Sequence, residues 1–226
     1  GRRARYDFFR RLARKRGCDM LATAHTADDQ AETVLLNMTR GAGAAGLSGI
    51  PYVSLHGALR VVRPLRDARR SEVLRFLEKR GLAWREDVSN ADPVFLRNRA
   101  RLELLPMLEK RFNPAVRNAL LRLGDIMAGE NEWMDFLADD VYRNCRGADA
   151  ALDAGKLAEF HVAARRRVLR RWLADIGLKP EEIDFETVER LDALHMQRAL
   201  ERGAVNTAGG LTVRCNKNGF LQAVAS

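Results

Sequence analysis

The stretch Leu21-Ala22-Thr23-Ala24-His25-Thr26-Ala27-Asp28-Asp29-Gln30-Ala31-Glu32-Thr33 decides the fold of this chain. An apolar run ends in a histidine, and three carboxylates follow it. Thr26 is suited to be a helix N-cap, because Asp29 follows at the spacing of a capping box. Apolar residues then recur at helical spacing up to Met38. We therefore predict a buried strand over about 19–24, a tight turn, and a helix that ends near Gly41.

This strand end is where a functional site is expected. In an open α/β sheet, ligands bind at the carboxyl ends of strands, beside helix N-termini. His25, Asp28, Asp29 and Glu32 fall at such a place, and the last two share one helix face because they are three residues apart. Two structural explanations compete. Acidic residues favour the first turn of any helix, since the helix dipole stabilises them there, and a single histidine at a strand end often only packs.

Composition points to a polyanionic partner. The chain has 226 residues, a formal net charge of +9 and a pI of about 10.1, which suggests nucleic acid first and an anionic membrane second. A protein with a merely charged surface is the alternative. Apolar residues make up 46% of the chain, but no apolar run approaches the roughly 20 residues of a membrane helix. The length suggests two domains.

The three cysteines argue against extracellular and metal-binding classes. Cys18, Cys145 and Cys215 lie far apart and match neither a disulfide framework nor a zinc motif. We expect a reducing, cytoplasmic location and no protein-bound metal site.

Further α/β elements follow on both sides of the opening stretch. A helix is predicted over 4–16, a strand over 59–62 and a helix over about 69–80. A helix leading into a parallel-type strand is half of a βαβ unit, so we expect the chain to begin inside a domain. The glycine-rich segment 41–49 suggests a loop where backbone must approach a ligand closely, although a flexible connector is an equal alternative.

An arginine pair opens the next predicted helix. Arg97 and Arg101 are four residues apart and share a face, with Asn98 between them. Two guanidinium forks on one face suit phosphate or carboxylate binding. An internal salt-bridge network with Glu86, Asp87 and Asp92, in an ordered loop over 84–93, is the alternative that the sequence leaves open.

The character changes after Asn113, which with Pro114 marks a strong helix start. We predict a long helix to about Asn144, helices over about 156–177 and 180–197, and β hairpins over 204–221, where Gly-Gly and Asn-Gly are turn signals. The expected domains are 1–104, 105–200 and 201–226. The densest basic run is Arg165-Arg166-Arg167 with Arg170-Arg171, and we predict Arg165, Arg166 and Arg170 to bind RNA phosphates. A solvated helix face is the competing interpretation.

Five motifs in order resemble one family, the tRNA(Ile)-lysidine synthases of the PP-loop ATP pyrophosphatases. They are His25-Thr26-Ala27-Asp28-Asp29-Gln30-Ala31-Glu32-Thr33, Arg40-Gly41-Ala42-Gly43 to Gly46-Leu47, Arg63-Pro64-Leu65, Glu86-Asp87-x-Ser89-Asn90, and Arg97-Asn98-x-x-Arg101 with Leu105-Pro106. The resemblance implies a partial Rossmann-like α/β domain with a parallel sheet, followed by an all-α domain and a short β tail.

The resemblance also implies a reaction and its participants. ATP, carried with Mg²⁺, would adenylate the C2 carbonyl oxygen of the anticodon wobble cytidine of tRNA(Ile), and free L-lysine would then attack C2 and displace AMP to give lysidine. By matching positions, His25, Asp29, Glu32 and Arg97 are expected to be catalytic. Substrate binding is expected from Asp28, Asn98, Arg101, Gly41 and Gly43. A homodimer is a further expectation.

One family motif is absent from this chain. The PP-loop itself, Ser-Gly-Gly-x-Asp-Ser, would lie after an earlier strand, and no such stretch occurs here. We therefore expect an N-terminally truncated chain with an incomplete catalytic site, inactive alone. The alternatives are a tRNA-binding fragment without catalysis, a degenerate paralogue, and a tRNA thiolase, which would need paired cysteines for its chemistry.

Overall fold

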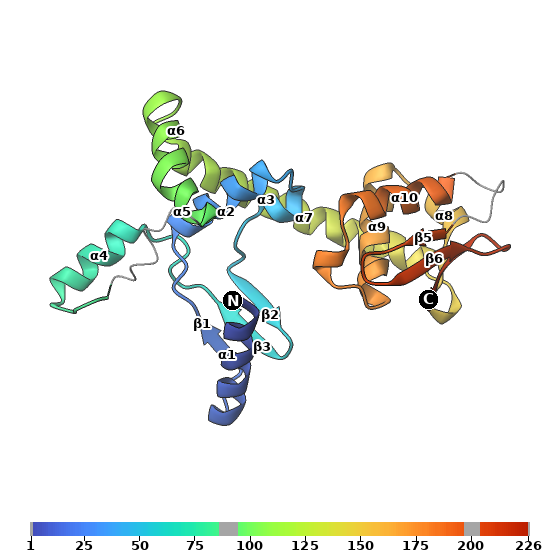
Figure 1. Ribbon diagram of the computed structural model, residues 1–226, viewed down its shortest axis with the longest axis horizontal. Coiled ribbons are helices and arrows are strands. Elements are labelled where there is room, and N and C mark those ends of the chain that lie inside the picture. The colour runs from blue at the N-terminus through green and yellow to red at the C-terminus, as the bar shows by residue number, and fades with distance from the viewer. Residues whose placement is uncertain (1, 86–94, 197–203, 226) are drawn as a thin grey trace. The chain divides into compact units, whose positions relative to one another are not determined.

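The computed structural model describes residues 2–85, 95–196 and 204–225, and these form two compact units, 1–131 and 132–226 (Figure 1). The predicted loop motif with Glu86, Asp87, Ser89, Asn90 and Asp92 lies outside the described residues. Within them, no helix is both long and apolar enough to cross a membrane.

The first unit combines a small sheet with helices. Its elements in chain order are α1 (Arg2–Arg16), β1 (Met20–Ala22), α2 (Ala27–Thr39), α3 (Ala44–Leu47), β2 (Val53–His56), β3 (Leu59–Val62), α4 (Arg70–Lys79), α5 (Leu96–Arg99), the π-helical turn η2 (Ala100–Leu104), α6 (Leu105–Arg111) and the first half of α7 (Val116–Cys145). The predicted order of strand, turn and helix is confirmed, with the helix beginning at Ala27. The strand is not buried as predicted, because Met20 and Ala22 are exposed and Leu21 is half-buried.

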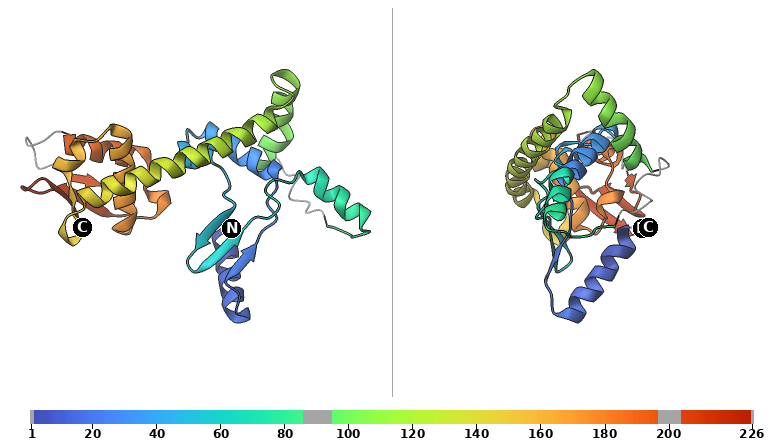
Figure 2. Two further views of the ribbon diagram at one scale, coloured as in Figure 1. Left: turned by 180° about the vertical axis from the view of Figure 1, so that it is seen from behind. Right: turned by 90° about the vertical axis from the view of Figure 1, so that its left-hand side faces the viewer.

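The sheet of the first unit has the order β1-β3-β2. Strand β1 pairs with β3 in parallel, with Leu21 opposite Val61. Strand β2, which the sequence patterns did not predict, forms an antiparallel hairpin with β3. Helix α1 lies beside this sheet (Figure 2), and Tyr6 on α1 stacks on His56 of β2 with ring centroids 4.3 Å apart.

A separate apolar core supports α2. Ala31, Val34 and Leu35 on its inner face pack with Leu105 of α6 and Leu120 of α7. Burial of this stripe is the main stabilisation of a 13-residue helix, because isolated helices of that length are marginal in water. The polar first turn of α2 is therefore held on a rigid element.

The second unit mixes helices with a four-stranded antiparallel sheet. It contains the second half of α7, η3 (Ala148–Ala150), β4 (Leu152–Asp153), α8 (Ala154–Ala158), α9 (Val162–Asp175), η4 (Pro180–Glu182), α10 (Phe185–Met196), β5 (Ala204–Asn206), β6 (Leu211–Cys215) and β7 (Phe220–Ala225). The strand order is β4-β7-β6-β5.

The C-terminal strands belong to the same core as the helices. Trp172 and Leu173 of α9 pack in one cluster with Val213 of β6 and Leu221 of β7. The structure thus confirms a helical region and C-terminal strands. The second unit begins at Glu132, and in it the C-terminal strand β7 pairs with β4.

Candidate functional site

The polar site is built at the first turn of α2. Thr26 is the N-cap: the Asp29 backbone N–H donates to its Oγ1 over 3.4 Å, and its own backbone N–H donates to Asp29 Oδ2 over 2.8 Å. This is the predicted capping box. It fixes the Asp29 carboxylate at the mouth of the helix, where the dipole favours negative charge.

Arg97 joins the two catalytic candidates of this turn. Its Nε donates to Glu32 Oε2 over 2.9 Å, and its Nη2 donates to Asp29 Oδ1 over 3.0 Å. Arg101 also faces Glu32, with 3.8 Å between Nε and Oε1. Asp29 and Glu32 therefore share one face of α2, as predicted. Arg97 and Arg101 approach that face from α5 and η2. Asn98, between them in sequence, is half-buried.

Glu32 is the most enclosed member of the group. The exposed fraction of its side chain is 4%, against 44% for Arg97. Burial raises the pKa of the Glu32 carboxyl above its ordinary value, and the hydrogen bond and charge of Arg97 act in the opposite direction. A carboxylate whose pKa is raised is a stronger base than an exposed one.

His25 and Arg97 line one cavity of about 420 Å³, together with Arg40, Gly49 and Arg63. Thr23 Oγ1 and His25 Nδ1 are 2.9 Å apart, so the strand end orients the imidazole. Several cationic side chains face this space. It could receive an anionic group beside the Asp29–Glu32 pair.

Arg63, in the Arg-Pro-Leu motif, has a structural place in this cavity wall. Its buried guanidinium donates to the Pro51 carbonyl over 2.8 Å and to Ser54 Oγ over 3.0 Å. It thereby ties the end of β3 to the segment leading into β2. These contacts satisfy most of the hydrogen-bond donors of the buried guanidinium and fix the local backbone.

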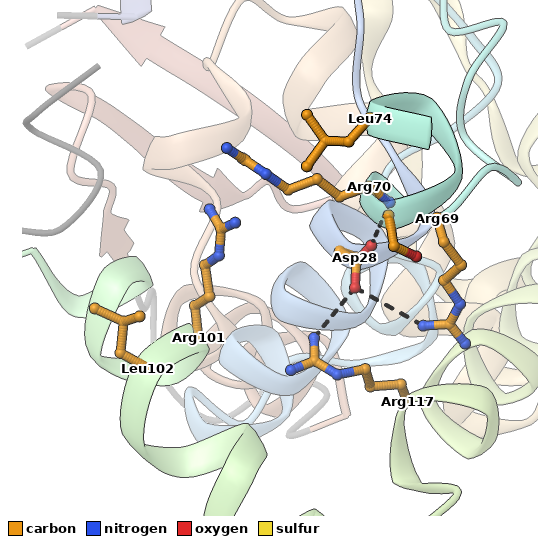
Figure 3. A pocket seen from close by; sticks show the side chains of 8 residues that line it. Asp28, Arg69, Arg70, Leu74, Arg101, Leu102 and Arg117 are labelled. Atoms are coloured by element: carbon orange, nitrogen blue, oxygen red, sulfur yellow. Dashed lines mark hydrogen bonds and ion pairs between the residues drawn. The ribbon is translucent and has the colours of Figure 1, made fainter. Parts of the chain in front are cut away.

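Asp28 points to a different group of residues. Its Oδ2 accepts the Arg70 backbone N–H over 2.8 Å, and its Oδ1 lies 3.3 Å from Arg117 Nη1 and 3.9 Å from Arg69 Nη1 (Figure 3). The consecutive residues Asp28 and Asp29 thus contact two different sets of residues. The structure does not bring Asp28 together with Arg97, although the sequence placed both in one site.

The glycines of the segment 41–49 lie in different places relative to α2, and the role of Gly41 and Gly43 in substrate binding stays a prediction. Gly41 and Gly43 follow the C-terminal end of α2, a helix roughly 20 Å long, away from the carboxylates at its beginning. Gly49 approaches the helix instead, through Gln30. A Cβ at Gly49 would lie 2.4 Å from Gln30 Oε1.

Gln30 is the residue that motif reasoning missed. It is buried, its Nε2 donates to the Ser48 carbonyl over 2.8 Å, and its Oε1 accepts the Ile50 backbone N–H over 2.6 Å. It therefore clamps the end of the glycine-rich segment to α2. The sequence feature that could have indicated its role is its position inside the Asp-Asp-Gln-x-Glu string.

The arginine run of α9 is largely engaged within the second unit. Arg165 makes a two-pronged pair with Asp192 at 2.7 and 2.8 Å, and Arg166 donates to Glu189 over 2.7 Å. Arg167 pairs with Asp135. Of the three predicted phosphate ligands, Arg170 alone is exposed.

Metal-ligand clusters are a separate question. Across the described ranges 2–85, 95–196 and 204–225, no three histidine, cysteine or acidic side chains are grouped as a metal centre requires.

Comparison with known proteins identifies the first unit. Residues 1–108 match the family model of the PP-loop domain. Together with the parallel strand pair, the polar strand end and the capped helix, this match gives the class of this part of the chain, which is a PP-loop domain. Residues 152–219 match the model of the TilS substrate binding domain.

The curated relatives match most of the chain. The tRNA(Ile)-lysidine synthase of Salinispora tropica is 37% identical over 212 residues, which cover 94% of this chain and 63% of that protein. That of Thermus thermophilus is 40% identical over 222 residues, covering 97% of this chain and 40% of that protein. Over most of its length this chain is similar to the tRNA(Ile)-lysidine synthases, and it spans less than two thirds of the length of these relatives.

Among solved structures, the U34-tRNA thiolase NcsA from Methanococcus maripaludis matches 55% of this chain and 42% of its own. The TM-score is 0.42 and the sequence identity 22%, a likeness that says nothing about function.

Proposed function

We propose that this chain serves the ATP-dependent joining of lysine to C2 of the wobble cytidine of tRNA(Ile), which gives lysidine. Its PP-loop domain and TilS substrate binding domain, and its relatives' names, support this proposal. The observation that carries it is the bridge of Arg97 between Asp29 and Glu32, because that bridge places two carboxylates and a guanidinium at one strand end.

The proposed reaction has two steps. The C2 carbonyl oxygen of the cytidine attacks the α-phosphorus of ATP, so that an O–P bond forms and diphosphate leaves. The ε-amine of lysine then attacks C2, the C–N bond forms, and the bond from C2 to the AMP oxygen breaks. The ammonium form of lysine must lose a proton to act as the nucleophile.

Asp29 and Glu32 suit the second step. Two carboxylates on one helix face offer an anionic partner for the lysine ammonium, and the raised pKa of Glu32 favours its role as proton acceptor. Arg97 fixes both carboxylates and is the positioning residue. His25 and Arg97 face one cavity and would supply fixed positive charge toward the phosphates.

The remaining participants follow from the reaction. ATP with its Mg²⁺, free L-lysine and tRNA(Ile) are the proposed substrates, and the cytoplasm is the proposed location. A homodimer stays a prediction, as do the domain limits 1–104, 105–200 and 201–226.

We also propose that the 226-residue chain is inactive alone, because it contains no Ser-Gly-Gly-x-Asp-Ser motif. The test measures ATP-dependent incorporation of labelled lysine into a tRNA(Ile) transcript. The chain alone should give none, and incorporation by it would contradict the inactivity.

A chimera tests the function itself. It places a strand and loop with the Ser-Gly-Gly-x-Asp-Ser motif before Gly1, and its circular dichroism is checked for folding. The chimera should incorporate lysine, and Glu32→Gln should lower that incorporation by about 100-fold or more. A folded chimera that leaves tRNA(Ile) unmodified would overturn the proposed reaction.

A further inference from the structure

A second pocket of the first unit carries an excess of positive charge. It encloses about 570 Å³ and is separate from the cavity that holds His25. Its lining includes four arginines, Arg69, Arg70, Arg101 and Arg117 (Figure 3). Among the residues that the structure describes, Asp28 is the one acidic residue that lines it. Three of the arginines, Arg69, Arg70 and Arg117, belong to none of the sequence motifs.

Asp28 is committed to two of these arginines and to the backbone. It accepts the Arg70 backbone N–H at 2.8 Å and lies within ion-pair distance of Arg69 and Arg117. Arg69 also pairs with Asn118, and Arg117 donates to Glu109 over 2.8 Å. These two guanidiniums are therefore held in place by protein groups, and they form one wall of the pocket.

The positive charges of the other two guanidiniums, those of Arg70 and Arg101, are less well compensated by acidic groups among the described residues. Figure 3 shows Arg70 and Arg101 extending toward the same side of the pocket. No carboxylate among the described residues is paired with the Arg70 side chain, and Arg101 has only Glu32, at 3.8 Å. Two cations that face one space repel each other unless an anion lies between them.

We propose that Arg70 and Arg101 form a subsite for a phosphodiester of the RNA substrate. Guanidinium forks match the geometry of phosphate oxygens, and arginine is the usual residue for such recognition. Leu74 and Leu102 also line the pocket and offer an apolar wall to a ribose or base. The inference rests on the proposed function for the identity of the anion as RNA.

The position of Arg101 connects this subsite to the catalytic candidates. The same side chain lines the pocket and faces Glu32. A backbone phosphate bound between Arg70 and Arg101 would place its nucleotides beside the Asp29–Glu32 pair. The subsite thus positions the RNA strand and takes no part in bond making.

The test measures the affinity of the 226-residue chain for an anticodon stem-loop transcript of tRNA(Ile) over about 50–200 mM salt. Arg70→Ala should lower the slope of log affinity against log salt by about 1, the value for one lost phosphate contact. Arg75→Ala is the matched control, because Arg75 lies exposed on the same helix and does not line the pocket. Its slope should equal that of the unsubstituted chain.

Arg70→Lys keeps the charge but loses the fork, so it should restore the slope while affinity stays several-fold reduced. Circular dichroism of each variant confirms folding. An unchanged slope for folded Arg70→Ala would overturn the subsite and leave the proposed function intact. Absence of RNA binding by the unsubstituted chain would overturn both.

Competition separates the sources of the anion. Inorganic diphosphate and ATP should displace the transcript equally from the unsubstituted chain and from Arg70→Ala. If their displacing effect depended on Arg70, the pocket would bind a nucleotide phosphate, and if lysine displaced the transcript through Arg70, it would bind a carboxylate. Either result would overturn the assignment to RNA.

Discussion

Arg97 Nε donates to Glu32 Oε2 over 2.9 Å although 65 positions separate the two residues. The bond connects the short helix α5 to the first turns of α2, and the same guanidinium also holds Asp29. Because Glu32 is nearly enclosed, its orientation is set by this partner rather than by water. The geometry of the candidate site is therefore a property of two segments together.

Replacing Glu32 by glutamine should remove activity and keep the fold. Glutamine retains the shape but cannot accept a proton, so lysidine formation by the active chimera should fall about 100-fold or more. Glu103→Gln is the control, because Glu103 forms an exposed pair with Arg99. Turnover close to that of the control would contradict the role of Glu32.

The pH dependence of stability should show the raised pKa of Glu32. The folded state binds the Glu32 proton more tightly than the unfolded state, so this group's contribution to the free energy of unfolding is full below the ordinary glutamate pKa, about 4.3. It is lost as pH rises through the raised value. Urea melts should therefore show that the free energy of unfolding of Glu32→Gln rises relative to that of the unsubstituted chain. This change should occur as pH rises from the ordinary to the raised pKa of Glu32. A constant difference would show that the pKa is not raised.

Arg97→Ala should destabilise the first unit by about 1–2 kcal/mol, a discounted value because the arginine is part-exposed. Arg97→Lys should recover only part of this loss, since one ammonium cannot reproduce both fork contacts. In a double-mutant cycle with Glu32→Gln, we expect a coupling energy of about 1 kcal/mol. Denaturant unfolding measures all three, and strictly additive losses would exclude the coupling.

Gly49→Ala should be more damaging than Gly57→Ala. Both glycines have positive φ, 72° and 65°, so alanine is strained at each by about 1 kcal/mol or slightly more. Only at Gly49 does the new Cβ meet the Gln30 amide, whereas nothing lies within 4 Å at Gly57. We expect an additional loss of about 1–2 kcal/mol at Gly49. Equal melting temperatures would show that the Gln30 clamp is unimportant.

Arg165→Ala should mainly lower stability, whereas Arg170→Ala should mainly weaken RNA binding. Arg165 and Asp192 have side chains only 12% exposed, so removing one partner should cost about 2–3 kcal/mol in stability. Arg170 is exposed, and its removal should leave stability within about 0.5 kcal/mol while weakening RNA binding. Thermal melts and a filter-binding titration measure the two effects. If Arg165→Ala weakened RNA binding at unchanged stability, Arg165 would be an RNA ligand as first predicted.

Local patterns predicted most elements, and pairing between distant segments limited the rest. The helix after Thr26 was predictable because its cap, dipole and apolar stripe all agree. Strand β2 has four residues, of which every second one is half-buried and the others are exposed. Its partner strand comes after a turn. Periodicity alone could therefore not indicate this strand. The two-residue strand β4 pairs with β7, and Leu152 also bridges Arg146. Because such a short strand has no periodic pattern, the sequence does not indicate that the C-terminal strands join it.

The site was predictable as a list of polar residues and less so as an arrangement. Helical spacing was enough to place Asp29 with Glu32 and Arg97 with Arg101. It could not show that Asp28, one position earlier, turns toward Arg69 and Arg117, because those residues come from elements distant in sequence. The internal partners of Arg165 and Arg166 were hidden for the same reason.

The first turns of α2 have a consequence for folding kinetics. Gln30 finds its partner 18 positions away, Asp28 reaches residues 42 and 89 positions away, and Glu32 pairs across 65. Contacts of such separation form only after long loops have closed, so we expect them to form late, on the native side of the transition state. Substitutions in this motif should hasten unfolding and leave the folding rate nearly unchanged. The residues proposed for chemistry would thus govern how long the folded unit persists rather than how quickly it arises.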